Sequence, residues 1–272
     1  MSLSAAWWPG VAASLAVASL APMASVAKKY TVMIVLTHGD DVASITPLAA
    51  KYAAEGHTVH HAIFPGLQGA IGEEPDSKGR EELRCASRAL GMAETFVTRG
   101  PEGQGHNTTA AIAARMVELI DETKPDVIIT WGPDGLTGHP RHILVGNVVT
   151  RVFQQQSRLA HRPRKLYYIA YPEDRFPETR APFGGIFPTV PLGTVSDRFI
   201  TTRVDARKYL TQSRLATACY TTPDLAPRAA RNERTFEQEW NHRTATTLDG
   251  IVFLRLALPA GRLDETDIFT GL

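Results

Sequence analysis

The stretch VMIVLTHGDD, residues 32–41, decides the fold class of this 272-residue chain. Its first half, VMIVL, is a continuous run of β-branched and other apolar residues, which is typical of a strand buried on both faces. Its second half, THGDD, is polar and contains a glycine, which indicates that the strand ends there. Apolar residues at helical spacing follow and stop at Gly56. The stretch therefore predicts a buried parallel strand that leads into a helix.

The alternation of strands and helices continues along the chain. The further expected strands are 58–64, 126–131, 166–170 and 198–204, and the expected helices are 80–90, 108–123, one from about residue 140, and 205–218. This order favours an α/β, Rossmann-like fold with a mostly parallel sheet and helices on both faces. We expect an apolar N-terminal segment (1–29) and a single domain (30–272). The C-terminal part of that domain should be rich in loops, because residues 172–191 are rich in proline.

The composition excludes several classes of protein. The chain has 29 basic and 28 acidic residues, so neither nucleic acid nor an anionic membrane is an expected partner. Two cysteines, Cys85 and Cys219, are too few for a disulfide framework or a four-thiolate zinc site. Both fall on predicted helices, where we expect buried thiols. The 9 histidines stand out, because histidine is the commonest metal ligand.

The N-terminal segment allows two interpretations. Residues 5–27 are small and apolar and end in a possible cleavage site, which resembles a secretory signal, but no Lys or Arg precedes them. The alternative is a helix or arm that packs on the domain. Pro9 and Pro22 interrupt the segment, so we expect no stable membrane span. The balance favours a cytoplasmic over an exported protein, and nothing in the sequence indicates an oligomeric state.

Two polar clusters follow predicted strands at the point where each strand ends. The first is HGDD (38–41), and the second is HPRH (139–142), which follows the strand ending at Trp131. Ligands of open α/β sheets bind beyond the carboxyl ends of the strands. Three nitrogen and oxygen ligands leave an open position on the metal, which is typical of catalytic zinc, and a fourth group is then spare for proton transfer. The two clusters therefore predict a mononuclear metal site.

This pair of clusters resembles the motifs of the LmbE-like, or PIG-L, superfamily of zinc-dependent N-deacetylases. Members of that family have H-P-D-D-E after the first strand and H-P-D-H later. Further similar stretches are AAEGHTV (53–59), the charged helix 82–91, PDV (125–127) and the terminal ETDIFTGL (265–272). The resemblance covers the chain from about Tyr30 onward, and it implies the fold expected above.

The resemblance also implies a role for each motif residue. His38, Asp41 and His142 would bind one zinc ion per chain, although another divalent metal is possible. Asp40 would be the general base, and His139 would stabilise the oxyanion or protonate the leaving amine.

Substrate contacts are a weaker expectation. A solvated helix face is the alternative for the arginine among the candidates, and a buried aromatic at the end of a strand is the alternative for the tryptophan. The four candidates are Gln68, Arg80, Thr137 and Trp131.

Three positions depart from the family pattern. Gly39 replaces a proline, which should loosen the loop without removing a ligand. Val42 replaces a glutamate, so a hydrogen-bond partner of the ligands is expected to be missing. Arg141 replaces an aspartate beside His139 and should disfavour the charged form of that histidine if it lies close.

The resemblance implies hydrolysis of the N-acetyl group of an N-acetylglucosamine-type glycoconjugate. The chain has 7 lysines and 22 arginines, a bias often seen in GC-rich actinobacterial proteins. Together with the unusual motifs, this bias favours a secondary-metabolite substrate such as a glycopeptide antibiotic. The alternatives are a metal-dependent amidase for another acyl group, and a degenerate, non-catalytic sugar-binding protein.

Overall fold

The computed structural model describes residues 28–64, 77–98, 109–175, 194–221, 249–259 and 264–272. Within them, seven strands form one sheet in the order β3-β2-β1-β4-β5-β9-β8. Strands β1 to β5 are parallel, whereas β9 runs antiparallel to both β5 and β8. The bounds are β1 Thr31–Leu36, β2 Thr58–Ile63, β3 Glu94–Val97, β4 Val127–Thr130, β5 Lys165–Ile169, β8 Thr202–Asp205 and β9 Ile251–Leu258. A separate pair joins β6 (Tyr171–Pro172) and β7 (Thr194–Val195).

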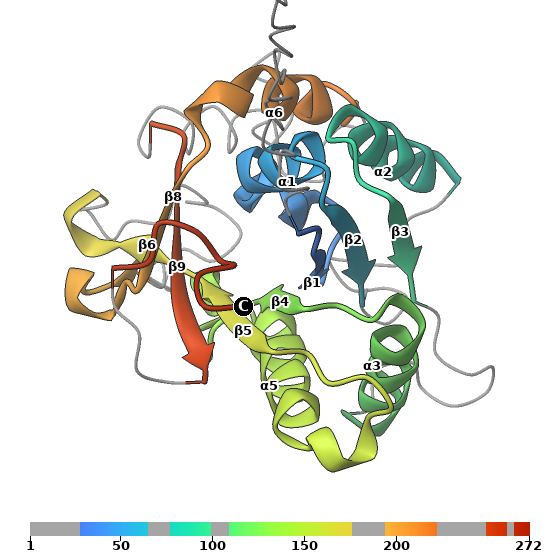
Figure 1. Ribbon diagram of the computed structural model, residues 1–272. Coiled ribbons are helices and arrows are strands. Elements are labelled where there is room, and N and C mark those ends of the chain that lie inside the picture. The colour runs from blue at the N-terminus through green and yellow to red at the C-terminus, as the bar shows by residue number, and fades with distance from the viewer. Residues whose placement is uncertain (1–27, 65–76, 99–108, 176–193, 222–248, 260–263) are drawn as a thin grey trace, which may run out of the picture.

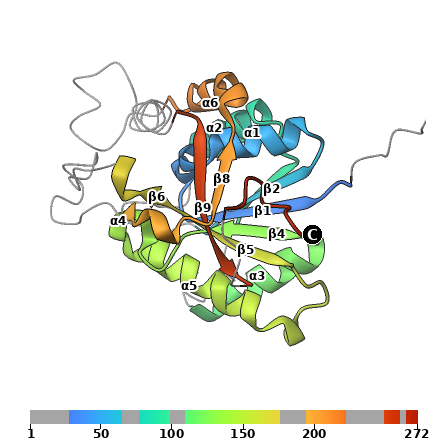
Figure 2. The same cartoon turned by 60° about the vertical axis from the view of Figure 1, so that its left-hand side comes forward.

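Helices cover both faces of the sheet, as expected (Figures 1 and 2). On one face lie α1 (Thr46–Ala54), α2 (Ser77–Ala89) and α6 (Leu210–Thr217), and on the other lie α3 (Thr109–Thr123) and α5 (Pro140–Gln154). Strand β1 contributes alternate side chains to two buried cores. Because both faces of β1 are covered, residues 32–36 of this strand are all apolar and buried.

The order of the strands places both polar motifs at one crevice. From β1 the chain proceeds to β2 and β3 on one side, and it then returns to β4 on the other side of β1. In open α/β sheets, ligands bind at such a reversal of strand order. Residues 38–41 directly follow β1, and residues 139–142 follow β4 after the single helical turn α4 (Gly135–Gly138). The topology therefore brings the two motifs together.

Several elements have bounds that differ from the predicted ones, and two strands were not predicted at all. The strand expected at 198–204 is β8 at 202–205, preceded by a 3-10 turn at 197–199, and the helix expected at 205–218 begins as a 3-10 turn before α6. Helix α2 begins at Ser77, three residues before the expected start at residue 80. Strands β3 and β9 were not predicted. Their order in the sheet depends on partners far along the chain, which local patterns do not reveal.

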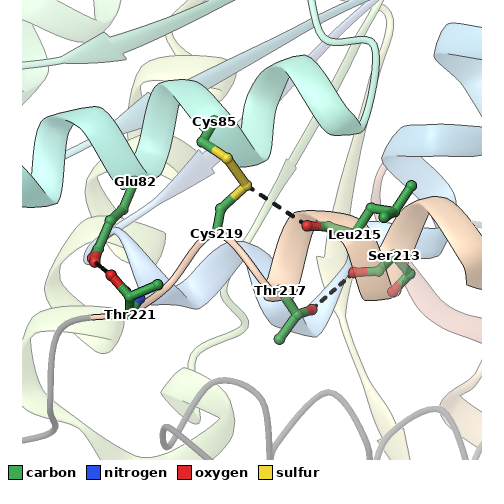
Figure 3. Close-up of a disulfide and its surroundings, with 7 residues drawn as sticks. All are labelled: Glu82, Cys85, Ser213, Leu215, Thr217, Cys219 and Thr221. Carbon is green, nitrogen blue, oxygen red and sulfur yellow. Dashed lines mark hydrogen bonds between the residues drawn. A yellow bond between two sulfur atoms is a disulfide. The ribbon is translucent and has the colours of Figure 1, made fainter.

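The expectation of two buried free thiols is wrong. Cys85 of α2 and Cys219, just after α6, form a disulfide (Figure 3). Their Cα atoms are 5.7 Å apart, although 134 residues separate them along the chain. Only the packing of α2 beside α6 brings them together. Disulfides persist mainly in oxidising compartments, so this one favours the exported alternative for the chain.

The expectation about membrane spans concerned residues 1–29, and residues 1–27 lie outside the described part of the chain. Among the helices that the structure does describe, none has the length and apolar character that crossing a membrane requires.

A buried polar network holds the C-terminal residues against the sheet. The Nζ of Lys165 donates to Oε1 of Glu265 at 2.8 Å, to the hydroxyl of Tyr167 at 2.6 Å and to the carbonyl of Ile268 at 3.0 Å. The hydroxyls of Tyr167 and Thr202 donate to the other oxygen of Glu265. Lys165 and Glu265 are each only 4% exposed. The terminal stretch 265–272 thus joins β5 to β8 through this ion pair.

Lys165→Met should lower the free energy of unfolding by about 3–5 kcal/mol, because it leaves the carboxylate of Glu265 buried without its opposite charge. Urea denaturation followed by circular dichroism measures this change. The matched control is Lys78→Met on the exposed side of α2, which should change the value by less than about 0.5 kcal/mol. A loss below about 1 kcal/mol in Lys165→Met would contradict the role given to the ion pair.

Candidate active site

The loop after β1 is held by the side chain of Asp41. Its Oδ2 accepts hydrogen bonds from the backbone N–H groups of Thr37 at 3.0 Å and His38 at 2.6 Å. Burial by itself would raise the pKa of Asp41, but the neighbouring His142 and His38 outweigh it and hold that pKa well below its usual range. The carboxylate is therefore ionised and fixed in place. Val42 is buried in the apolar core, so the polar contacts of the ligands come from the backbone instead.

The ring of His142 is oriented by the turn that precedes it. Its Nδ1 lies 3.0 Å from the carbonyl of Gly135, which assigns the proton to Nδ1 and leaves Nε2 as the acceptor. A Cβ at position 135 would lie 2.8 Å from Cγ1 of Ile143, and the φ of Gly135 is +64°, so this turn requires glycine. A hydrogen bond of this kind commonly orients a metal-binding histidine.

Trp131 lies behind His142. The two rings stack with centroids 4.2 Å apart and planes inclined by 4°, and the indole Nε1 donates to Oγ1 of Thr37 at 3.1 Å. Trp131 is only 1% exposed, which favours the alternative of a buried aromatic that supports His142. A contact between Trp131 and substrate stays a prediction.

Three side chains converge in a geometry that fits a metal ion. The Nε2 of His142 lies 3.2 Å from Nδ1 of His38 and 3.3 Å from Oδ1 of Asp41, and Nδ1 of His38 lies 3.4 Å from Oδ2 of Asp41. Ligands at about 2.0–2.2 Å from a tetrahedral zinc ion are about 3.3–3.6 Å from one another. The donor types fit zinc, and the separations, which run to both oxygens of Asp41, are close to this spacing.

His139 completes a cluster of three histidines. Its ring centroid lies 4.9 Å from those of His38 and of His142, and the three residues offer nitrogen atoms within 4.8 Å of one another. His139 precedes the first turn of α5, where its Nδ1 accepts the backbone N–H of Arg141 at 3.1 Å. This hydrogen bond leaves Nε2 to carry the proton.

Burial, and then the neighbouring His142 and His38, lower the pKa of His139 to about 4. Arg141 lowers the pKa of His139 further, in the direction expected from the sequence. The guanidinium of Arg141 donates to the carbonyl of Phe64 at 3.0 Å. A neutral His139 is suited to donate a hydrogen bond rather than to act as an acid.

The remaining predicted site residues are only partly described. The backbone of Asp40 begins the 3-10 turn at 40–44, but its side chain, like that of Thr137 in α4, lies outside the described parts of the chain, and so does all of Gln68. Arg80 is partly exposed in the first turn of α2, three residues before Leu83. Since the side chain of Leu83 lies next to Gly39, Arg80 is on the face of α2 turned towards the loop 38–41.

Sequence reasoning missed one residue at this site. The hydroxyl of Tyr220 donates to the carbonyl of Gly39 at 2.8 Å. The two residues are 181 positions apart, and no motif surrounds Tyr220, so the sequence offered no signal for this contact.

Comparisons with known proteins agree with this geometry. Residues 33–153, which include both motifs, match the family model "PIG-L: GlcNAc-PI de-N-acetylase". A 1D-myo-inositol 2-acetamido-2-deoxy-alpha-D-glucopyranoside deacetylase of Streptomyces griseus is 30% identical over 65% of this chain and 70% of its own length. The deacetylase of the same name from Acidothermus cellulolyticus is 26% identical over 89% of this chain and 95% of its own length.

Solved structures share the fold at low identity. The 4-carboxy-2-hydroxymuconate hydratase GalB of Pseudomonas putida has a TM-score of 0.57 at 14% identity, over 85% of this chain and 98% of its own. A deacetylase of teicoplanin biosynthesis has a TM-score of 0.51 at 14% identity, over 85% of this chain and all of its own. Because a hydratase and a deacetylase share this fold, the fold alone does not decide the reaction. The family match and the relatives do decide it: this chain belongs to the PIG-L, or LmbE-like, family of N-deacetylases.

Proposed function

We propose that the chain is a zinc-dependent hydrolase that removes the acetyl group of an N-acetylglucosamine-type glycoconjugate and releases acetate and a free amino sugar. The observation that carries this proposal is the triangle of His38, Asp41 and His142, with the neutral His139 beside it. These three residues would hold one zinc ion or another divalent metal, with an open position for substrate.

Zinc in this site would supply a Lewis acid for the acetamide carbonyl and a water molecule whose pKa is lowered to about 7. Asp40 takes the proton of the attacking water as general base. The Nε2–H of His139 donates to the oxygen on which negative charge develops. Asp40 then returns its proton to the leaving amine, because a neutral His139 has no proton to spare for that step while it holds the oxyanion.

The relatives support a narrower substrate class. The two described above are named for the deacetylation of an N-acetylglucosamine that is α-linked to inositol. We therefore infer that an uncharged N-acetylglucosaminyl inositol is the first substrate to test. A glycopeptide antibiotic remains an alternative, and the structural likeness to the teicoplanin deacetylase supports only the fold.

Acetate release separates the proposed enzyme from its alternatives. Metal-loaded protein should release acetate from the N-acetylglucosaminyl inositol, measured by a coupled acetate assay beside an N-acetylglucosaminyl glycopeptide. Faster turnover of long N-acyl analogues would favour the alternative of a metal-dependent amidase for another acyl group. Metal-loaded protein that binds these sugars without any acyl release would favour the sugar-binding protein.

The His142→Ala variant should no longer retain near-stoichiometric zinc, because the substitution removes one of the three proposed ligands. His139→Ala should keep the zinc and lower kcat about 10²–10³-fold, because it removes one donor to the oxyanion. Plasma emission spectrometry after dialysis gives the zinc content, and the acetate assay gives kcat. The two variants are matched, since both histidines belong to one motif. Loss of zinc in His139→Ala would instead identify His139 as a ligand.

Asp40→Asn should abolish detectable turnover and leave the zinc content unchanged, because the amide keeps the shape of the side chain but cannot accept the proton of water. The same two measurements apply, with Asp134→Asn as the control for a carboxylate that caps α4. Near-normal turnover in Asp40→Asn would show that another group is the base.

A further inference from the structure

Tyr220 contacts the loop that holds two of the three proposed ligands. It is 6% exposed, and its hydroxyl donates to the carbonyl of Gly39 at 2.8 Å. Gly39 lies between His38 and Asp40. The hydrogen bond therefore acts directly on the backbone that carries a proposed ligand and the proposed general base.

Both neighbours of Tyr220 are attached to α2 (Figure 3). Cys219 forms the disulfide with Cys85, and the backbone N–H and the hydroxyl of Thr221 each donate to Oε1 of Glu82 at 2.9 Å. Glu82 and Cys85 are three residues apart and thus lie on the same side of α2. Two attachments on either side of Tyr220 fix its position relative to this helix.

Gly39 explains why such a contact is useful. Its φ is −67° and its ψ is −33°, so the loop keeps the φ near −65° that a proline ring would enforce. A Cβ at this position would lie 3.2–3.3 Å from side-chain carbons of Leu83 on α2, so glycine permits the close approach of the helix. Glycine alone does not restrict the backbone, and contacts from outside the loop must do so.

We infer that Tyr220 is a positioning residue for the metal-binding loop 38–41, held in place by the Cys85–Cys219 disulfide and by the Glu82–Thr221 contact. The hydroxyl replaces part of the restraint that a proline at position 39 would supply. The consequence for catalysis rests on the proposed function, whereas the consequence for metal affinity does not.

Tyr220→Phe tests this inference, because it removes only the hydroxyl. Loss of one hydrogen bond to the loop should raise the dissociation constant for Co²⁺ about 3- to 10-fold, measured by visible absorption as the metal is titrated into the metal-free, full-length protein. In the zinc enzyme, kcat should fall by a similar factor with KM unchanged, because Tyr220 contacts the loop and not the substrate.

Tyr168→Phe is the matched control. Its hydroxyl makes a hydrogen bond of 2.8 Å with Oγ1 of Thr150, on the other face of the sheet, so it loses a comparable contact. It should leave the Co²⁺ dissociation constant within about 2-fold of the wild-type value. Thermal unfolding of both variants checks that they are folded.

The double variant Cys85→Ser/Cys219→Ser tests the attachment to α2. This double variant should also weaken Co²⁺ binding. In the triple variant that also carries Tyr220→Phe, the total rise of the Co²⁺ dissociation constant should be much smaller than the product of the two separate factors, because both changes act through the same contact. Serine variants are used instead of a thiol reductant because thiolates bind zinc and cobalt.

The inference is overturned if Tyr220→Phe leaves both the Co²⁺ dissociation constant and kcat within about 2-fold of wild type, or if its effect multiplies fully with that of the cysteine variants. If the wild-type protein releases no acetate while Tyr220→Phe still weakens Co²⁺ binding, the proposed function fails and the positioning role stands.

Discussion

The ionised carboxylate of Asp41 is the group on which the rest of the candidate site depends. One of its oxygens accepts two backbone N–H groups of the loop, and both oxygens face imidazole nitrogens. A buried carboxylate is costly unless hydrogen bonds and positive charge compensate it. Here the same contacts that compensate it also shape the loop and bring His38 within 3.2 Å of His142. The contacts that fold this loop thus also place the proposed metal ligands.

The topology explains why this carboxylate meets His142 at all. Strand β1 has β2 on one side and β4 on the other, so the loops that follow β1 and β4 begin at the same edge of the sheet and diverge. His38 and Asp41 come from the first loop and His142 from the helix after the second. His38 and His142 are 104 positions apart, and the described segments between them form the α/β units that fix this edge. The metal site is therefore a property of the sheet and not of either motif alone.

The sequence predicted the parts of the site that local patterns encode. The buried strand 32–36 and the motifs after it and after β4 placed His38, Asp41, His139 and His142 in one crevice, because parallel strands end at one edge. The disulfide, the contact of Tyr220 with Gly39 and strand β9 were not predicted. Each depends on packing between segments far apart in the chain, such as those that carry Cys85 and Cys219, which are 134 positions apart. No periodicity or spacing encodes that packing.

The three departures from the family motifs have different consequences. At position 42 a buried apolar valine stands beside Asp41, whose carboxylate accepts two backbone N–H groups. At position 39 the hydroxyl of Tyr220 donates to the carbonyl of Gly39, the contact inferred above to compensate for the missing proline ring. Arg141 differs from these two positions, because its charge contributes to the low pKa of His139.

Burial first, then His142 and His38, and least of all Arg141 lower the pKa of His139 to about 4. The backbone N–H of residue 141, which an aspartate would also supply, leaves the proton of the ring on Nε2. A relative with aspartate at this position would instead stabilise an imidazolium, which can both hold an oxyanion and donate a proton. In the proposed mechanism the two tasks separate: His139 retains the first, and Asp40 supplies the proton for the leaving amine. The variant motif thus keeps every group that the proposed mechanism needs, and the low pKa of His139, due mainly to burial, assigns the proton of the leaving amine to Asp40 in that mechanism.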